Sequence, residues 1–499
     1  MTQNHNLDQI FNKALIYHKN NKIKEAANEY IKIIKLEPKY FQAYNNLGVI
    51  HERINKDNEA KNLFLNAIKL NPNYIDAIYN LGNIYNKSKD HNLAKKYFEK
   101  IIKIDSNNEK AFNALGITFY NLLNIKKAKY CFQKIIDINN NNYEAYYNLG
   151  KISNEEEKFE EAIKLFNQCL NINPNHSNAY NNLGIAYNKL SLTNKAKHYI
   201  EKSIKINPNN FYSYNNLGLV YDNIYNIKKA KENFNKAIKI NPNFTDAWWN
   251  LHCCSKTVDE ALKILEKVYE IEKNHISAKI MISALRGYNG DMRDYKTLMS
   301  SKYYNHPYAR SVNWIFSQKK LPKLFFNKWD FFDFVIDLTQ KKRPFYEYGV
   351  RLGHSFKYLI QTFKKGYGFD TFTGLPEDWH YSKSKGSYSS FGKVPNIEGG
   401  EFIVGKFEET LPNFFFKKRE VASLINFDAD LYSSTICSLN NSKKIIDNKT
   451  ILVFDEFLMN SNWEKDEYRA LNEFCENSGY TYEVLAVSFF TKQVAIRIV

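Results

Sequence analysis

The hydrophobic pattern changes character along the chain. Up to about residue 275, apolar residues recur every three or four positions in short segments separated by polar turns, which predicts a succession of amphipathic helices. Beyond about residue 324, short runs of apolar and aromatic residues alternate with helical segments. This alternation predicts an α/β domain in which helices cover both faces of a mostly parallel sheet.

The helical half is an internal repeat. The pattern returns after 34 residues, as from Gly48 to Gly82. Small residues at a fixed phase let two helices touch, large aromatic residues fill the space between them, and proline stops the second helix. Counting Ala14 and His252 as the first and last versions of the glycine gives eight units, the last of them shortened. The recurring residues are Gly48, Gly82, Gly116, Gly150, Gly184 and Gly218; Ala26, Ala60, Ala94, Ala128, Ala162, Ala196 and Ala230; Phe64, Phe98, Phe132, Phe166 and Phe234; and Pro38, Pro72, Pro174, Pro208 and Pro242.

One further position of the repeat carries asparagine, except for Ala114. Its members are Asn46, Asn80, Asn148, Asn182, Asn216 and Asn250. Because an amide both donates and accepts, such a ladder could clamp the backbone of an extended peptide, whereas a chain rich in lysine and asparagine also places asparagine on any solvated face. The period is that of tetratricopeptide repeats, and the array resembles the superhelix of the O-GlcNAc transferases. That resemblance implies a protein or peptide partner in the groove.

We expect three regions: a tetratricopeptide α-solenoid in residues 1–275, a connector with short helices in 276–323, and the α/β domain in 324–499. A helix over 328–340 should cover one face of the sheet. The seven expected strands are 345–350, 366–372, 400–407, 422–431, 450–458, 482–487 and 493–499.

The first two expected strands carry the features of a nucleoside site. Glu347 ends an apolar run, Gly349 and Gly353 follow, Ser355 opens a helix, and Asp370 ends the second strand. Glycine allows close backbone approach, a helix N-terminus favours a negative group, and an acid about 20 residues on can hold a ribose diol. The missing third glycine disfavours a pyrophosphate and leaves room for S-adenosylmethionine. A purely structural strand turn is the alternative.

Further acids follow the later strands. Asp428 and Asp430 end one strand, and Asp455 with Glu456 end the next. Carboxylates at one rim of a sheet repel one another unless something positive lies among them. We therefore expect Asp428, Asp455 and Glu456 to hold a divalent cation, Mg²⁺, because hard cations prefer oxygen ligands. Separately solvated strand-end acids are the alternative.

Five segments from about Pro307 onward resemble the macrocin O-methyltransferase family of class I S-adenosylmethionine-dependent methyltransferases. They are EYGVRLGHS, GFDTFTGLPEDW, GKFEETLP, FDADLYSST and VFDEF. The resemblance implies a Rossmann-like domain with a mostly parallel seven-stranded sheet whose last strands form a hairpin. It also implies methyl transfer to a hydroxyl of a sugar, glycan or related small molecule.

The resemblance assigns roles to particular residues. Glu347, Gly349 and Gly353 would line the amino-acid end of the cofactor, Ser355 its carboxylate and Asp370 its ribose, while Phe407 or Glu408 would lie near the adenine. Val350 would be a further cofactor-binding residue. Asp428, Asp455 and Glu456 match the metal-binding positions, with Asp430 or His380 as the base. Two departures are Glu456, where the family often has aspartate, and the pair Arg351 and Leu352 on the acceptor side.

Composition and charge limit the classes of partner and the cellular location that we expect. The net charge is +17, but the basic residues are scattered at helical spacing, which favours a solvated basic surface over nucleic-acid binding. The six cysteines show no metal spacing, no apolar run is long enough to span a membrane, and no export signal precedes the repeats, so we expect a cytoplasmic protein. The alternative function is a tetratricopeptide scaffold whose methyltransferase-like domain binds cofactor without catalysis.

Overall fold

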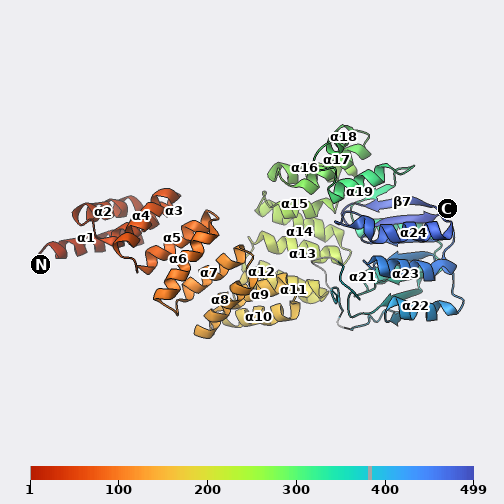
Figure 1. The fold of residues 1–499 in the computed structure, drawn as a ribbon, viewed down its shortest axis with the longest axis horizontal. Coiled ribbons are helices and arrows are strands. Elements are labelled where there is room, and N and C mark those ends of the chain that lie inside the picture. The colour runs from red at the N-terminus through yellow and green to blue at the C-terminus, as the bar shows by residue number, and fades with distance from the viewer. Residues whose placement is uncertain (1, 380–384, 391) are drawn as a thin grey trace. The chain divides into compact units, whose positions relative to one another are not determined.

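The computed structural model describes residues 2–379, 385–390 and 392–499. The chain forms two compact units, residues 1–186 and 187–499, and each is considered by itself. The described residues form a helical array followed by a C-terminal mixed sheet with flanking helices (Figure 1).

The array consists of eight helix pairs, as the repeat predicts. Their bounds are α1 (Thr2–Lys19) and α2 (Ile23–Leu36), α3 (Phe41–Arg53) and α4 (Asp57–Leu70), α5 (Ile75–Lys87) and α6 (His91–Ile104), α7 (Glu109–Asn121) and α8 (Ile125–Ile138), α9 (Tyr143–Glu155) and α10 (Phe159–Ile172), α11 (Ser177–Lys189) and α12 (Thr193–Ile206), α13 (Phe211–Asn223) and α14 (Ile227–Ile240), α15 (Thr245–His252) and α16 (Val258–Ile271).

The repeated glycines are required by the aromatic residue of the second helix. A Cβ atom on Gly150 would lie 2.7 Å from the ring of Phe166, and one on Gly82 would lie 2.6 Å from the ring of Phe98. Both rings are buried. The turn inside each of the first seven pairs also repeats, with one residue in the left-handed region: Asn21, Asn55, Lys89, Leu123, Glu157, Ser191 and Tyr225.

The predicted connector contains more regular structure than its sequence indicated. It holds α17 (Ile276–Tyr288), α18 (Arg293–Met299) and α19 (Pro307–Phe316). One hydrophobic core runs from Ala261 of the last pair through Ala278 and Val312 to Tyr346 of the sheet. The hydrophobic core is therefore continuous across residues 275 and 323, the expected ends of the array and of the connector.

The C-terminal sheet has eight strands in the order β1-β7-β8-β6-β5-β2-β3-β4. The strands are β1 (Lys323–Phe325), β2 (Phe345–Tyr348), β3 (Gly366–Asp370), β4 (Gly400–Val404), β5 (Leu424–Phe427), β6 (Ile451–Phe454), β7 (Tyr482–Ser488) and β8 (Val494–Ile498). All seven predicted strands are present, and β1 adds an eighth that is too short to stand out in the sequence. Only β8 is antiparallel to its neighbours, β6 and β7, so the sheet is mixed.

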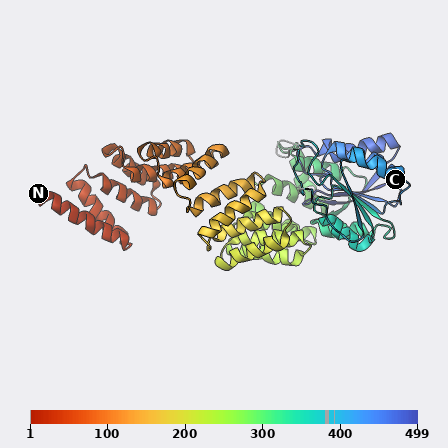
Figure 2. The same ribbon diagram turned by 90° about the horizontal axis from the view of Figure 1, so that it is seen from below.

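Helices cover both faces of this sheet. In Figure 2, the blue helices α22 (Phe407–Phe416), α23 (Tyr432–Ser442) and α24 (Glu467–Ser478) lie on one side, and the teal helices α20 (Lys328–Asp337) and α21 (His354–Phe363) lie on the other. Alternation along each strand divides the side chains between two cores. In β2, for example, Tyr346 faces the first layer and Phe345 faces the second.

Candidate functional site

A cavity of about 310 Å³ opens at the carboxyl ends of the central strands. From β2 the chain proceeds outward through β3 to β4, whereas β5 and β6 lie on the opposite side of β2. The strand order therefore reverses between β2 and β5, and ligands of open α/β sheets bind in the crevice at such a point. Its lining residues include Gly349, Val350, Ser355, Asp370, Phe407, Glu408, Asp428, Asp430, Asp455 and Glu456, together with Lys328, Arg351, His354, Tyr388, Lys406 and Ser434.

The turn after β2 brings the ends of three strands together. Gly349 has φ +87°, and its N–H donates to the Phe369 carbonyl at 2.9 Å. Asp428 N–H donates to the Tyr348 carbonyl at 2.8 Å. A Cβ on Gly349 would lie 1.8 Å from the Asp428 carbonyl oxygen, so only glycine fits this approach.

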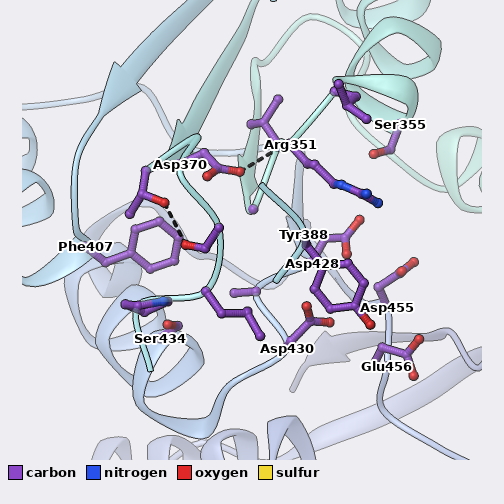
Figure 3. Close-up of a pocket in the computed structure, with 18 of the residues that line it drawn as sticks. Arg351, Ser355, Asp370, Tyr388, Phe407, Asp428, Asp430, Ser434, Asp455 and Glu456 are labelled. Atoms are coloured by element: carbon purple, nitrogen blue, oxygen red, sulfur yellow. Dashed lines mark hydrogen bonds between the residues drawn. The ribbon is translucent and has the colours of Figure 1, made fainter. Parts of the chain in front are cut away.

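Asp370, the last residue of β3, supports this turn. Its carboxylate accepts from Arg351 N–H at 2.7 Å and from Phe372 N–H at 2.6 Å. Burial raises the pKa of Asp370, and these backbone donors act in the opposite direction. The Val350 N–H and the Thr371 side chain also donate to this carboxylate, which lines the cavity. Figure 3 shows the contact between Asp370 and Arg351.

Three predicted cofactor residues lie differently from expectation. Glu347 is fully buried below the cavity, and Ser355 Oγ donates to its Oε1 at 2.5 Å. The Ser355 proton is thus engaged by Glu347 rather than presented to a ligand carboxylate. Burial raises the pKa of Glu347 to about 8, against the opposing effects of Ser355 and Lys328. Gly353, in the left-handed region at the start of α21, packs near Ile397 and is not among the residues that line the cavity.

The later acids gather as predicted. Figure 3 shows Asp428, Asp430, Asp455 and Glu456 at one side of the cavity and Phe407 at the opposite side. Asp430 has φ +59°, an uncommon conformation for a residue other than glycine and one that clusters at functional sites. The pKa values of Asp428 and Asp430 are raised, first by burial and then by neighbouring carboxylates. His380 lies outside the described residues.

Two lysines lie among these carboxylates. Lys328 Nζ is 2.9 Å from Asp455 Oδ1 and 3.7 Å from Asp428 Oδ2, and Lys492 Nζ is 2.7 Å from Glu456 Oε2. Burial alone would lower the pKa of Lys328, but attraction to Asp455 and Asp428 raises it above its ordinary value. The ammonium group is therefore a permanent positive charge.

This arrangement does not fit the predicted Mg²⁺ site. All three expected ligands pair with lysine, and within residues 2–379, 385–390 and 392–499 no group of three or more His, Cys, Asp or Glu side chains is placed to hold a metal ion. Sequence reasoning missed Lys328 because it opens a helix that precedes all the motifs. The sequence did contain one indication of this role. The helix expected over residues 328–340 was predicted to cover the sheet, and Lys328 is its first charged residue.

The asparagine ladder makes contacts between adjacent repeats. The Nδ2 group of Asn80 donates to Asn45 at 3.0 Å, that of Asn182 to the Tyr147 hydroxyl at 3.1 Å, and that of Asn250 to Asn215 at 3.0 Å. Asn148 bonds in the same way to Asn113 at 3.3 Å. All six ladder residues are half-buried. One such bond leaves an amide with another N–H and free lone pairs, so a structural role and a binding role are compatible.

Among the helices in the part of the chain that the structure describes, none is long and apolar enough to cross a membrane.

The chain was compared with curated proteins and with solved structures. A search of curated proteins gives no match. Among solved structures, a tetratricopeptide repeat protein from Parabacteroides merdae is 18% identical with a TM-score of 0.43, and the alignment covers 49% of this chain and 97% of that one. YrrB, described as a TPR protein with an unusual peptide-binding site, is 26% identical with a TM-score of 0.32, covering 38% and 96%. MamA is 26% identical with a TM-score of 0.30, covering 32% and 95%.

Family models give the residues concerned. Tetratricopeptide repeat models match residues 75–108, 143–176 and 177–210, and related models match 14–55, 41–74 and 199–232. These matches lie within residues 14–232. This part of the chain is a tetratricopeptide repeat array.

Proposed function

We propose that the chain is an S-adenosylmethionine-dependent O-methyltransferase that acts on a hydroxyl of a sugar, glycan or related small molecule, and that its repeat array binds a protein partner. The observation that carries the first part is the cavity at the point where the strand order reverses, with Gly349 at its floor and Asp370 at the end of β3. The antiparallel strand β8 between β6 and β7 agrees with the terminal hairpin that the family resemblance implies.

The charge of the cavity supports a cationic cofactor. Its lining includes six carboxylates, on Asp370, Glu408, Asp428, Asp430, Asp455 and Glu456, and three basic side chains, on Lys328, Arg351 and Lys406. The excess of negative charge suits a sulfonium. Asp370 would accept from the ribose hydroxyls, and the Phe407 ring with Val350 would flank the adenine.

The chemistry needs little from the protein beyond placement. When bound, S-adenosylmethionine supplies an electrophilic methyl group. The chain then has to orient an acceptor hydroxyl toward it and take up the hydroxyl proton. Asp430 suits the second task, because its carboxylate lines the cavity beside Asp428, Asp455 and Glu456. Burial and the neighbouring Glu456 and Asp455 raise its pKa.

Methyl transfer can be measured directly. The full chain would be incubated with isotopically labelled S-adenosylmethionine and a panel of sugars and glycans, beside Asp430→Asn, which keeps the size of the side chain and removes its basicity. We expect label in at least one acceptor and a loss of 100-fold or more in the variant. Equal transfer by the variant would exclude Asp430 as the base.

The second candidate function is a protein-interaction scaffold, which the tetratricopeptide array itself favours. In that case the C-terminal domain would bind the cofactor without methylating any acceptor. Cofactor binding without transfer across the panel would support the scaffold.

The groove has its own test. Alanine at Asn148, Asn182 and Asn216 should reduce binding of a partner identified by proximity labelling. A matched control replaces the exposed turn residues Asn107, Asn141 and Asn175, which recur at the same period. Equal binding by the two triple variants would exclude the ladder as the contact surface.

A further inference from the structure

Lys328 occupies the place where the sequence predicted a metal ion. It is the first residue of α20 and lines the cavity, with its ammonium group between Asp455 and Asp428. Asp428 and Asp455 directly follow the adjacent parallel strands β5 and β6. The ion pair to Asp455 is partly buried, with 22% and 18% of the two side chains exposed.

A divalent ion and this ammonium group exclude each other. Mg²⁺ requires oxygen ligands at about 2.0–2.1 Å in near-octahedral geometry. The ammonium group already lies 2.9 Å from Asp455 Oδ1, within the space that such an ion would use, and its charge would repel the ion. Asp455 Oδ1 also accepts from Gln493 Nε2 at 2.5 Å, which further engages the ligand atom.

The position of Lys328 is fixed by the repeat array. On one side of it, Asn327 caps α20 by accepting from Asp330 N–H at 2.8 Å, and its Nδ2 group donates to the Cys253 carbonyl at 3.3 Å. On the other side, Trp329 Nε1 donates to the Asp222 carbonyl at 3.1 Å. Both carbonyls belong to the last two helix pairs of the array. The start of α20 is therefore held from both sides, and the ammonium group is placed before any ligand arrives.

We propose that the Lys328 ammonium group is a resident cation that takes the place of the divalent metal in the acceptor site. It donates to the acceptor oxygen and stabilises the negative charge that grows there as the hydroxyl proton passes to a carboxylate. An ammonium has three N–H donors, so the bond to Asp455 leaves donors for the acceptor. This inference rests on the proposed methyltransferase function, and it makes methyl transfer independent of divalent ions.

The inference can be tested by measuring Mn²⁺ binding, which requires no knowledge of the methyl acceptor. Mn²⁺ is titrated into the full chain, and the loss of the free-ion signal is followed by electron paramagnetic resonance. We expect no stoichiometric Mn²⁺ binding by the wild type. Lys328→Met, which removes the charge at similar length, should bind one Mn²⁺ at least ten-fold more tightly. Lys328→Arg, which keeps the charge, should behave as the wild type does.

Lys492→Met is the matched control. It frees Glu456 and leaves Lys328 between Asp428 and Asp455, so it should gain no Mn²⁺ site. One tightly bound Mn²⁺ in the wild type, lost in Asp455→Asn, would overturn the inference. The wild-type measurement does not depend on the folding of any variant.

Failure of this inference is distinguishable from failure of the proposed function. S-adenosylmethionine is titrated into the wild type with EDTA and then with Mn²⁺. Cofactor binding together with a stoichiometric Mn²⁺ site would overturn only the role of Lys328. Absence of cofactor binding under both conditions would contradict the methyltransferase itself.

Discussion

Gly349 offers the sharpest test of the site geometry. Replacement by alanine places a Cβ atom 1.8 Å from the Asp428 carbonyl oxygen. Since real Cβ contacts are essentially never shorter than 3.0 Å, the ends of β2 and β5 would have to separate by about 1.2 Å, the difference between the two distances. That movement would break the 2.8 Å hydrogen bond from Asp428 N–H to the Tyr348 carbonyl.

The magnitude follows from two contributions. The left-handed conformation costs alanine about 1–2 kcal/mol, and the lost hydrogen bond costs about 1 kcal/mol more. The total is about 3 kcal/mol, and the movement also carries Asp428 out of place. Gly479→Ala is the matched control, because Gly479 also has a positive φ, +69°, but a Cβ there would meet nothing within 4 Å. It should cost only the conformational part.

The assays are thermal unfolding and calorimetric titration of S-adenosylmethionine. One kcal/mol corresponds to about 2–4 °C in the melting temperature of a domain of about 150–250 residues. We expect Gly349→Ala to lower the melting temperature by about 2–4 °C more than Gly479→Ala does, which corresponds to the lost hydrogen bond, and to weaken cofactor binding about ten-fold or more. If the two variants unfold and bind alike, the close approach of β2 and β5 is refuted.

Three further predictions concern the array, its contact with the site, and pH. Gly150→Ala should lower the free energy of unfolding in urea by about 1–3 kcal/mol, because the added Cβ meets the ring of Phe166 at 2.7 Å. Adding Phe166→Ile to this variant should restore part of the lost stability. No restoration in the double variant would contradict the packing of Gly150 against Phe166. Tyr225→Phe removes the hydroxyl that donates to the His354 carbonyl and should cost about 1 kcal/mol, whereas an unchanged melting temperature would show that this bond is unimportant. The pKa of Glu347 is raised to about 8 in the folded state, so its contribution to stability is fully present below the unfolded pKa, near 4.5, and is lost as the pH rises through 8. Glu347→Gln should abolish that dependence in melting curves from pH 5 to 9, and an unchanged slope would contradict the assignment.

The helices of the array were predictable from the sequence because the same packing contact recurs in successive repeats. The glycine and the aromatic residue that meets it recur together, and a wrong assignment at one unit would conflict with all the others. The eight helix pairs and the seven longer strands were therefore found. The three-residue strand β1 was not, since three residues carry no measurable period.

The site was only partly predictable from the sequence. Acids at strand ends meet at one rim because parallel strands end at one edge of a sheet, so the gathering of Asp428, Asp430, Asp455 and Glu456 could be expected. Their counter-charges could not. Lys328 and Lys492 come from outside the motifs, and the burial that directs Glu347 toward Ser355 instead of a ligand depends on packing by α20 and α21. The acids alone favoured a metal site, because the motifs do not show that Lys328 and Lys492 pair with them.

Calorimetric titration of S-adenosylmethionine into the full chain tests the central claim most directly. Asp370→Ala is compared with Asp337→Ala, whose side chain is 74% exposed on the surface of α20. We expect one site of micromolar affinity in the wild type and in Asp337→Ala, with a loss of about ten-fold or more in Asp370→Ala. No binding by the folded wild-type chain, or equal binding by both variants, would contradict it.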